Sequence, residues 1–175
     1  MIPEEHALRQ LFHQTVNVCY ADHLGIHDAE VTSYIADLLT EFCAAENLYR
    51  IRDAAGNPVK EVGQMVMASD PVHGTAPSFD VERRVRKHIG DYALFSTGMF
   101  PEAVHHARFG GEAGFLDMVR TGKESYYIVS QFNLFEYESE APFFGRLAEE
   151  FERYMYGLTK VRGELDRMGT PMYPM

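Results

Sequence analysis

Apolar side chains recur every three or four residues along most of this 175-residue chain, and this spacing limits the fold more than any other feature. It is the spacing of one face of an α-helix, whereas a half-buried β-strand alternates apolar and polar residues. The two most regular stretches are Val31, Tyr34, Ile35, Leu38, Leu39 and Phe42, and Phe144, Leu147, Phe151, Tyr154, Met155, Leu158, Val161 and Leu165. The sequence therefore predicts a mostly all-α fold, with about six helices packed as a single bundle-like domain.

Capping residues and helix breakers predict where the first helices begin and end. Pro3 suits a first helical turn, Gly25 ends the first helix, and Asp28 caps the second. Ser78 is expected to cap a third helix that runs to about Thr97. The first two helices, joined by a short link, are expected to form an antiparallel hairpin.

The later elements are less regular. Residues 48–62 contain alternating segments around a turn, which favours one small β-hairpin. A short helix is expected over 101–107, and another over 112–120 with Gly122 as its C-cap. Pro142 is expected to begin one long final helix. The sequence thus predicts a helical domain over residues 1–168 and a frayed tail over 169–175.

Residues 123–137 form an ambiguous segment, because Tyr126, Tyr127, Ile128 and Val129 are residues that strands favour. The run is long, lacks turn signals, and is apolar on nearly all sides. We therefore interpret it as a buried central helix rather than a strand.

The composition excludes some classes of function. The formal net charge is −10, which disfavours binding to nucleic acid. The one basic cluster, Arg83, Arg84, Arg86 and Lys87, is interpreted as a solvated helix face. No apolar run is long enough to cross a membrane, and the N-terminus does not resemble a signal peptide. We expect a soluble, acidic, cytoplasmic protein whose cysteines, Cys19 and Cys43, are free thiols. A disulfide between them is the alternative, because the sequence does not give the distance between the two residues.

No motif in the chain specifies a reaction or a cofactor. The phosphate-binding loop, the dinucleotide-binding glycine pattern, the zinc-protease motif, paired C-x-x-C cysteines and the G-x-S-x-G elbow are all absent from the sequence. Whether the protein is an enzyme is therefore left open, and no cofactor or ligand is indicated.

Glu102 and His105 are the strongest metal-ligand candidates, because a glutamate and a histidine three apart project from one helix face. Di-iron bundles use this pattern twice, together with two further glutamates, and here it occurs once. A mononuclear site would need another ligand, such as His88 or Asp91. The alternative is structural, with Glu102 in a first helical turn and His105 at a helix end.

A pocket between helices is a second candidate site. Polar groups of residues 88–106 and of residues 123–137 could line it, and ligand sites in bundles commonly lie between helices. Its candidate residues are Lys87, His88, Asp91, Tyr92, Ser96, Tyr126 and Tyr127. The alternative is that the same groups satisfy one another in the core.

Residues 85–102, with the sequence VRKHIGDYALFSTGMFPE, resemble an uncharacterised family of bacterial all-helical cytoplasmic proteins, and so do residues 122–128, GKESYYI. The resemblance implies a helical domain and transfers no catalytic role.

Three hypotheses of function follow from these patterns. The first is a helical interaction or scaffold protein that can self-associate, for instance as a homodimer. It is motivated by the 13% aromatic content and by the missing catalytic signature. The second is a small-molecule binding protein or enzyme that uses the inter-helical pocket. The third is a mononuclear metalloprotein that uses Glu102 and His105.

Overall fold

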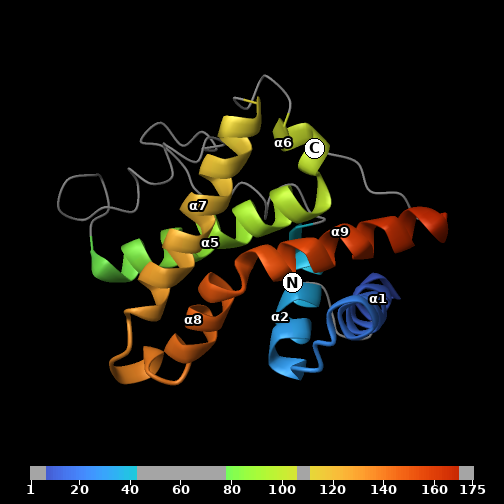
Figure 1. Ribbon diagram of the computed structural model, residues 1–175. Coiled ribbons are helices and arrows are strands. Elements are labelled where there is room, and N and C mark those ends of the chain that lie inside the picture. The colour runs from blue at the N-terminus through green and yellow to red at the C-terminus, as the bar shows by residue number, and fades with distance from the viewer. Residues whose placement is uncertain (1–6, 43–77, 106–110, 170–175) are drawn as a thin grey trace. The chain divides into compact units, whose positions relative to one another are not determined.

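The computed structural model describes residues 7–42, 78–105 and 111–169, and these residues form an all-α fold (Figure 1). The expected helical, bundle-like class is confirmed for this part of the chain. The expected β-hairpin at 48–62 lies outside the described residues, as do Pro3 and Cys43. The helices are α1 (Ala7–Leu24), α2 (Ala29–Phe42), α5 (Phe79–Met99), α6 (Pro101–His105), α7 (Gly111–Ser130), the short 3₁₀ helix η2 (Phe135–Tyr137), α8 (Ala141–Glu149) and α9 (Phe151–Arg167).

The chain divides into two compact units that interleave along the sequence. Unit 1 comprises Met1–Leu48, Phe95–Phe115 and Glu152–Met175, and unit 2 comprises Tyr49–Leu94 and Leu116–Phe151. The helices α5 and α7 each contribute residues to both units. The expectation of one domain over residues 1–168 stays a prediction. None of the described helices is long and apolar enough to cross a bilayer.

In unit 1, α1 and α2 pack together as the expected hairpin. Gly25 ends α1 in the left-handed region, at φ 66°, and the Asp28 carboxylate accepts the Glu30 backbone N–H at 3.0 Å, as an N-cap should. The buried Arg9 pairs with Asp37 across the two helices. His13 lies 2.8 Å from the same Asp37 carboxylate and is partly exposed.

The helix α9 completes unit 1 by packing closely on two other segments. A Cβ at Gly157 would lie 2.5 Å from the Tyr20 ring, so only glycine allows this approach, and the Tyr20 hydroxyl donates to the Tyr154 carbonyl at 2.6 Å. Thr159 and Arg162 donate to the carbonyls of Gly98 and Met99 at 3.1 and 2.7 Å. These two side chains satisfy carbonyls that the end of α5 leaves without helical partners.

In unit 2, α7 runs across α5, and glycine again sets the distance between helices (Figure 1). A Cβ at Gly90 would lie 2.6 Å from the Tyr126 ring, and one at Gly122 would lie 2.7 Å from the Ala93 Cβ. The expectation that Gly122 ends a helix is therefore wrong. Gly122 is buried inside α7, where a close helix contact requires a residue without a side chain.

Two other expected helix boundaries are also wrong. The predicted central helix over 123–137 ends at Ser130, and the chain continues as a loop with one 3₁₀ turn. The final helix breaks at Glu150, which separates α8 from α9. The apolar stripe continues across that break, which is why the sequence suggested one helix. Ser78 does cap α5, because its Oγ accepts the Val81 backbone N–H at 3.2 Å.

Candidate functional site

Three residues of the predicted pocket meet between α5 and α7. The Tyr126 hydroxyl donates to Asp91 Oδ1 at 2.6 Å, and Lys87 Nζ donates to Asp91 Oδ2 at 3.2 Å. Asp91 is 7% exposed and Tyr126 is fully buried. A buried carboxylate needs hydrogen-bond donors, and Tyr126 and Lys87 supply one to each oxygen of Asp91. The cluster is therefore consistent with a structural role in the core.

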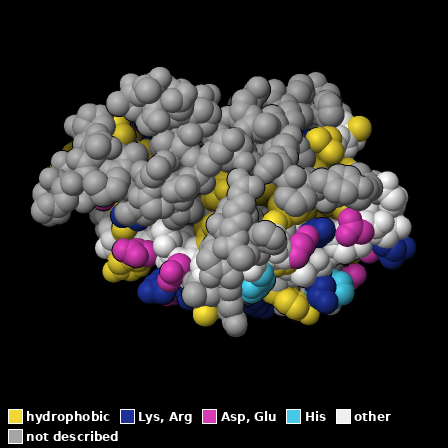
Figure 2. All heavy atoms as spheres, turned by 90° about the horizontal axis from the view of Figure 1, so that it is seen from above, with side chains coloured by type: hydrophobic (Ala, Val, Ile, Leu, Met, Phe, Trp, Pro, Cys, Tyr) yellow, Lys and Arg dark blue, Asp and Glu magenta, His cyan; other side chains and the backbone are white. Residues whose placement is uncertain are grey.

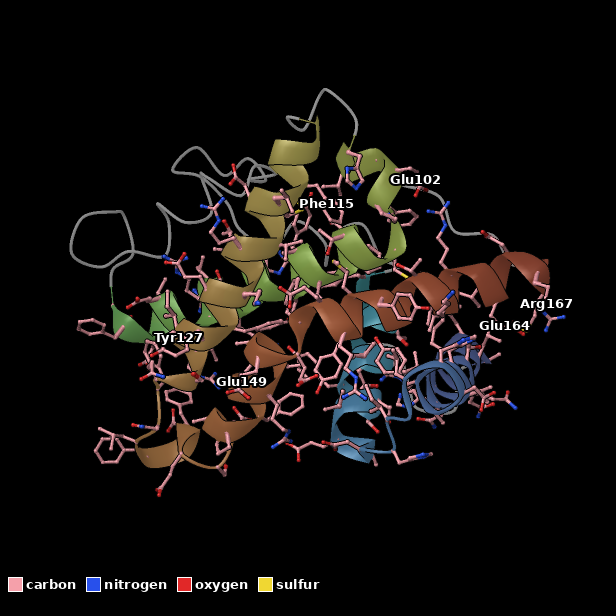
Figure 3. The ribbon with its side chains drawn as sticks, viewed as in Figure 1. Glu102, Phe115, Tyr127, Glu149, Glu164 and Arg167 are labelled. Carbon is pink, nitrogen blue, oxygen red and sulfur yellow. The ribbon has the colours of Figure 1, made fainter. Side chains whose placement is uncertain are left out.

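The other predicted pocket residues have different surroundings. His88 is buried, with its ring centroid 6.5 Å from that of Tyr92. Tyr127 is 58% exposed and projects outward from α7 (Figure 3). Ser96 is partly buried, and its carbonyl accepts the Phe100 N–H at 3.0 Å. A ligand site at these residues stays a prediction.

The basic cluster on α5 does not form the expected solvated face. Arg86 is only 9% exposed and donates to the Ser125 hydroxyl at 3.3 Å. The Arg83 side chain is 12% exposed, and Lys87 pairs with Asp91. Only Arg84 is well exposed. The charge pattern favoured a solvated face, but Arg83 and Arg86 lie on a side of α5 that contacts Glu140 and Ser125 of unit 2.

The candidate metal ligands Glu102 and His105 both have other partners. The Glu102 carboxylate pairs with Arg162 (Glu102 is labelled on α6 in Figure 3). Partial burial raises the pKa of this carboxyl, but the hydrogen bond and charge of Arg162 outweigh it, so the pKa is lowered overall. The His105 ring stacks on Phe115 at 4.1 Å. Within the described ranges, no group of three or more His, Cys, Asp or Glu side chains is placed to hold a metal ion. The metal site stays a prediction.

The most unusual local structure is the segment 131–140 between α7 and α8, which we call the tip loop. Phe135 is 90% exposed, and its neighbour Leu134 is 67% exposed. Phe135 also has a φ of 54°, in the left-handed region, and among the described residues it is the only one other than glycine with a positive φ. A bulky aromatic residue in this region is a conformational outlier. The tip loop thus exposes the Phe135 side chain to water while the Phe135 backbone has an unfavourable left-handed conformation.

Side chains from α5 anchor the tip loop. Arg83 donates to the Glu140 carboxylate at 2.7 Å, and its guanidinium lies 4.1 Å from the centroid of the Tyr137 ring. The Tyr137 hydroxyl donates to Asp80 Oδ1 at 3.0 Å, and this hydrogen bond is the main reason that the pKa of Tyr137 is raised. Phe132 packs edge-on against Tyr137, with centroids 6.4 Å apart. Several contacts together can hold a backbone that is unfavourable by itself.

An open hollow of about 540 Å³ lies beside the exposed tip. It is lined by Ser130, Asn133, Glu138, Ala141, Pro142 and Gly145. Two of these residues, Asn133 and Glu138, belong to the tip loop and flank Leu134 and Phe135 in the sequence. The hollow and the tip are therefore parts of one surface of unit 2.

The tip loop is strongly acidic. It contains Glu136, Glu138 and Glu140, and the sequence has no lysine or arginine between Lys123 and Arg146. Elsewhere the charges are mixed: on the face drawn in Figure 2, the described Lys and Arg side chains are scattered among Asp and Glu. Because Arg83 pairs with Glu140, the acidic groups of the tip loop that this arginine does not pair with are Glu136 and Glu138, on either side of Tyr137.

Comparisons with protein-family models, with curated proteins and with solved structures find no match to this chain. The proposals below therefore depend on the geometry of the described residues alone. The predicted resemblance to a bacterial helical family stays a prediction.

Proposed function

We propose that this chain is an interaction protein that docks on a partner protein through the tip loop, residues 131–140. The observation that carries the proposal is Phe135, which is 90% exposed on a backbone with a φ of 54°. The proposal agrees with the interaction role that the sequence favoured, and it adds the surface through which the chain would bind.

The energetics of Phe135 support a docking role. Left-handed backbone at such a residue costs about 1–3 kcal/mol. Leaving a phenylalanine side chain in water forgoes a further 1.5–3 kcal/mol, roughly what its burial would contribute. Both terms are unfavourable in the isolated chain. A partner that covers Phe135 recovers the second term, and the anchored loop means that little entropy is lost when it binds.

The charge around the tip indicates the chemistry of the partner. Phe135 needs an apolar cleft, and Glu136 and Glu138 beside it favour a cleft with lysine or arginine at its rim. A second copy of the chain is less suitable, since two tip loops in contact would bring glutamates together. The proposed partner is therefore a different protein with a basic-rimmed apolar cleft.

A photo-crosslinking residue at position 135 tests the proposal in cells that make the protein. We expect a discrete adduct with one protein, and we expect the same reagent at Tyr156, another exposed aromatic residue, to give no such adduct. The partner is then purified. The Phe135→Ser variant should bind it at least about tenfold more weakly, and Tyr156→Ser should bind it normally.

Two results would contradict the proposal. One is the absence of any adduct specific to position 135, and the other is a purified complex whose Kd is unchanged by Phe135→Ser. An adduct between two copies of the chain would replace the proposed partner with self-association, the other expectation from the sequence.

We place this interaction in the cytoplasm. Cys19 is a buried free thiol, and burial, together with the charges of Glu164 and Asp22, raises its pKa. A thiol of this kind is unreactive, and free thiols are typical of reducing compartments. Localisation of a fluorescent fusion tests this part of the proposal, and a secreted fusion would contradict it.

A further inference from the structure

We propose that the hollow beside the tip binds a lysine or arginine side chain of the partner while the tip docks. This inference rests on the proposed function and names the second contact of the same surface. The lining of the hollow carries it, since Glu138 supplies a carboxylate, Asn133 and Ser130 supply polar groups, and Ala141, Pro142 and Gly145 supply apolar surface.

That lining matches the two parts of a long basic side chain. The methylene stem of lysine or arginine packs on apolar surface, while its charged head seeks hydrogen-bond acceptors. In the hollow, the residues from α8 offer the apolar surface and the tip loop offers the carboxylate. The hollow is open, with a volume of about 540 Å³, so it suits a side chain that is presented on a partner surface rather than an enclosed ligand.

Glu138 is the group that selects for positive charge. Arg83, which contacts the tip loop, pairs with Glu140 and lies over the Tyr137 ring. No described lysine or arginine forms an ion pair with Glu138. An arginine head would gain charge-assisted hydrogen bonds there, at the open side of the hollow.

The spacing along the loop lets one partner use both contacts. Asn133 and Glu138 lie on either side of Leu134 and Phe135 in the sequence, so the hollow and the tip share one short loop, and we infer that one partner contacts both. Apolar contact then supplies affinity, and the basic side chain supplies register and specificity.

Two probe peptides separate these contributions. The first is a short amphipathic peptide made only of leucine and arginine, and in the second each arginine is replaced by citrulline, its neutral analogue. Binding is measured by calorimetry on the full chain. We expect the arginine peptide to bind about tenfold more tightly, and chemical shifts of the Gly145 amide to report occupancy of the hollow.

Three variants assign the effects. Glu138→Gln should reduce the preference for arginine over citrulline to less than about twofold. Glu124→Gln removes the same charge from an exposed position on α7 and should leave the preference intact. Phe135→Ser should weaken both peptides by a similar factor and preserve the preference.

The possible failures are distinguishable. A preference for arginine that survives Glu138→Gln, or that falls equally with Glu124→Gln, overturns the role of the hollow. Binding of both peptides that is unaffected by Phe135→Ser counts against the proposed docking by the tip, while the Glu138 result still decides the hollow.

Discussion

Two regions of unit 2, the crossing of α5 and α7 and the tip loop, differ in why their backbone would favour glycine. Where α5 and α7 cross, Gly90 and Gly122 occupy ordinary helical positions and are glycine because a neighbouring side chain fills the space of a Cβ. In the tip loop, space is plentiful, and the backbone of Phe135 has the conformation that glycine prefers. The first region is organised for packing. In the second, an exposed aromatic side chain is kept where packing gives no reason for it, which points to function.

The largest expected effect lies at the helix crossing. Gly122→Val would place a Cβ 2.7 Å from the Ala93 Cβ and 2.8 Å from the Phe151 ring, and would add two methyl groups in the same space. We expect a loss of roughly 3 kcal/mol or more in the free energy of unfolding, measured by urea titration. Gly163→Ala on α9 is the control, because nothing lies within 4 Å of its Cβ position, and it should gain up to about 1 kcal/mol. Similar results for both variants would show that the helices are not in close contact.

The second effect concerns the buried cluster at the same crossing. Tyr126→Phe removes the donor that lies 2.6 Å from Asp91 Oδ1 and leaves the ring in place. We expect a loss of about 2 kcal/mol, because a buried carboxylate loses a charge-assisted hydrogen bond. Chemical denaturation measures it, and Tyr127→Phe on the exposed face of α7 should change little. A neutral Tyr126→Phe would mean that Asp91 is solvated.

The third expected effect is a gain in stability, and it tests the difference between the helix crossing and the tip loop most directly. Phe135→Gly relieves the left-handed strain, and we expect stability to rise by about 1 kcal/mol while partner binding is lost. Leu134→Gly is the matched control: Leu134 has an extended backbone at φ −115°, so no strain is relieved there. If thermal unfolding shows that Phe135→Gly destabilises the chain, the strain assigned to the tip loop is not present in solution.

The smallest expected effect is a pH dependence of the hydrogen bond between Tyr137 and Asp80, which holds the tip loop to α5. The hydrogen bond and charge of Asp80 raise the pKa of Tyr137 in the folded chain. The contact therefore contributes fully below the pKa of the unfolded tyrosine and is lost as pH rises through the folded pKa. NMR titration of the Tyr137 ring should show ionisation at a lower pH in Asp80→Ala. Unchanged titration would show that Asp80 does not hold the loop.

Much of the helical framework could be predicted from local patterns. The caps at Asp28 and Ser78 and the stop at Gly25 were correct because each is settled within a few residues. The end of α7 at Ser130 was missed because residues 123–137 form a long, largely apolar run without a glycine or proline that would mark a turn. Within that segment, Glu136 is a charged residue at a position that a helix buried on all sides would have to enclose, and this was a signal in the sequence that the helix ends earlier.

The candidate site was predictable only in part, for a similar reason. Lys87 and Asp91 are one helical turn apart, so the sequence could pair them, and Tyr126 was suspected as a polar group on a central helix. The burial of Arg86 and the anchoring of Tyr137 by Arg83 depend on segments far apart in the chain. No local pattern contains that information.

By itself, the sequence determined that this chain is helical and where several helices begin and end, because helix periodicity and capping act over a few residues. Only the tertiary structure decided which glycines bring helices together, which charges are buried, and that Phe135 stands in solvent on a left-handed backbone. These properties depend on which distant side chains meet. That is why the proposed docking surface was found in the structure and not in a sequence motif.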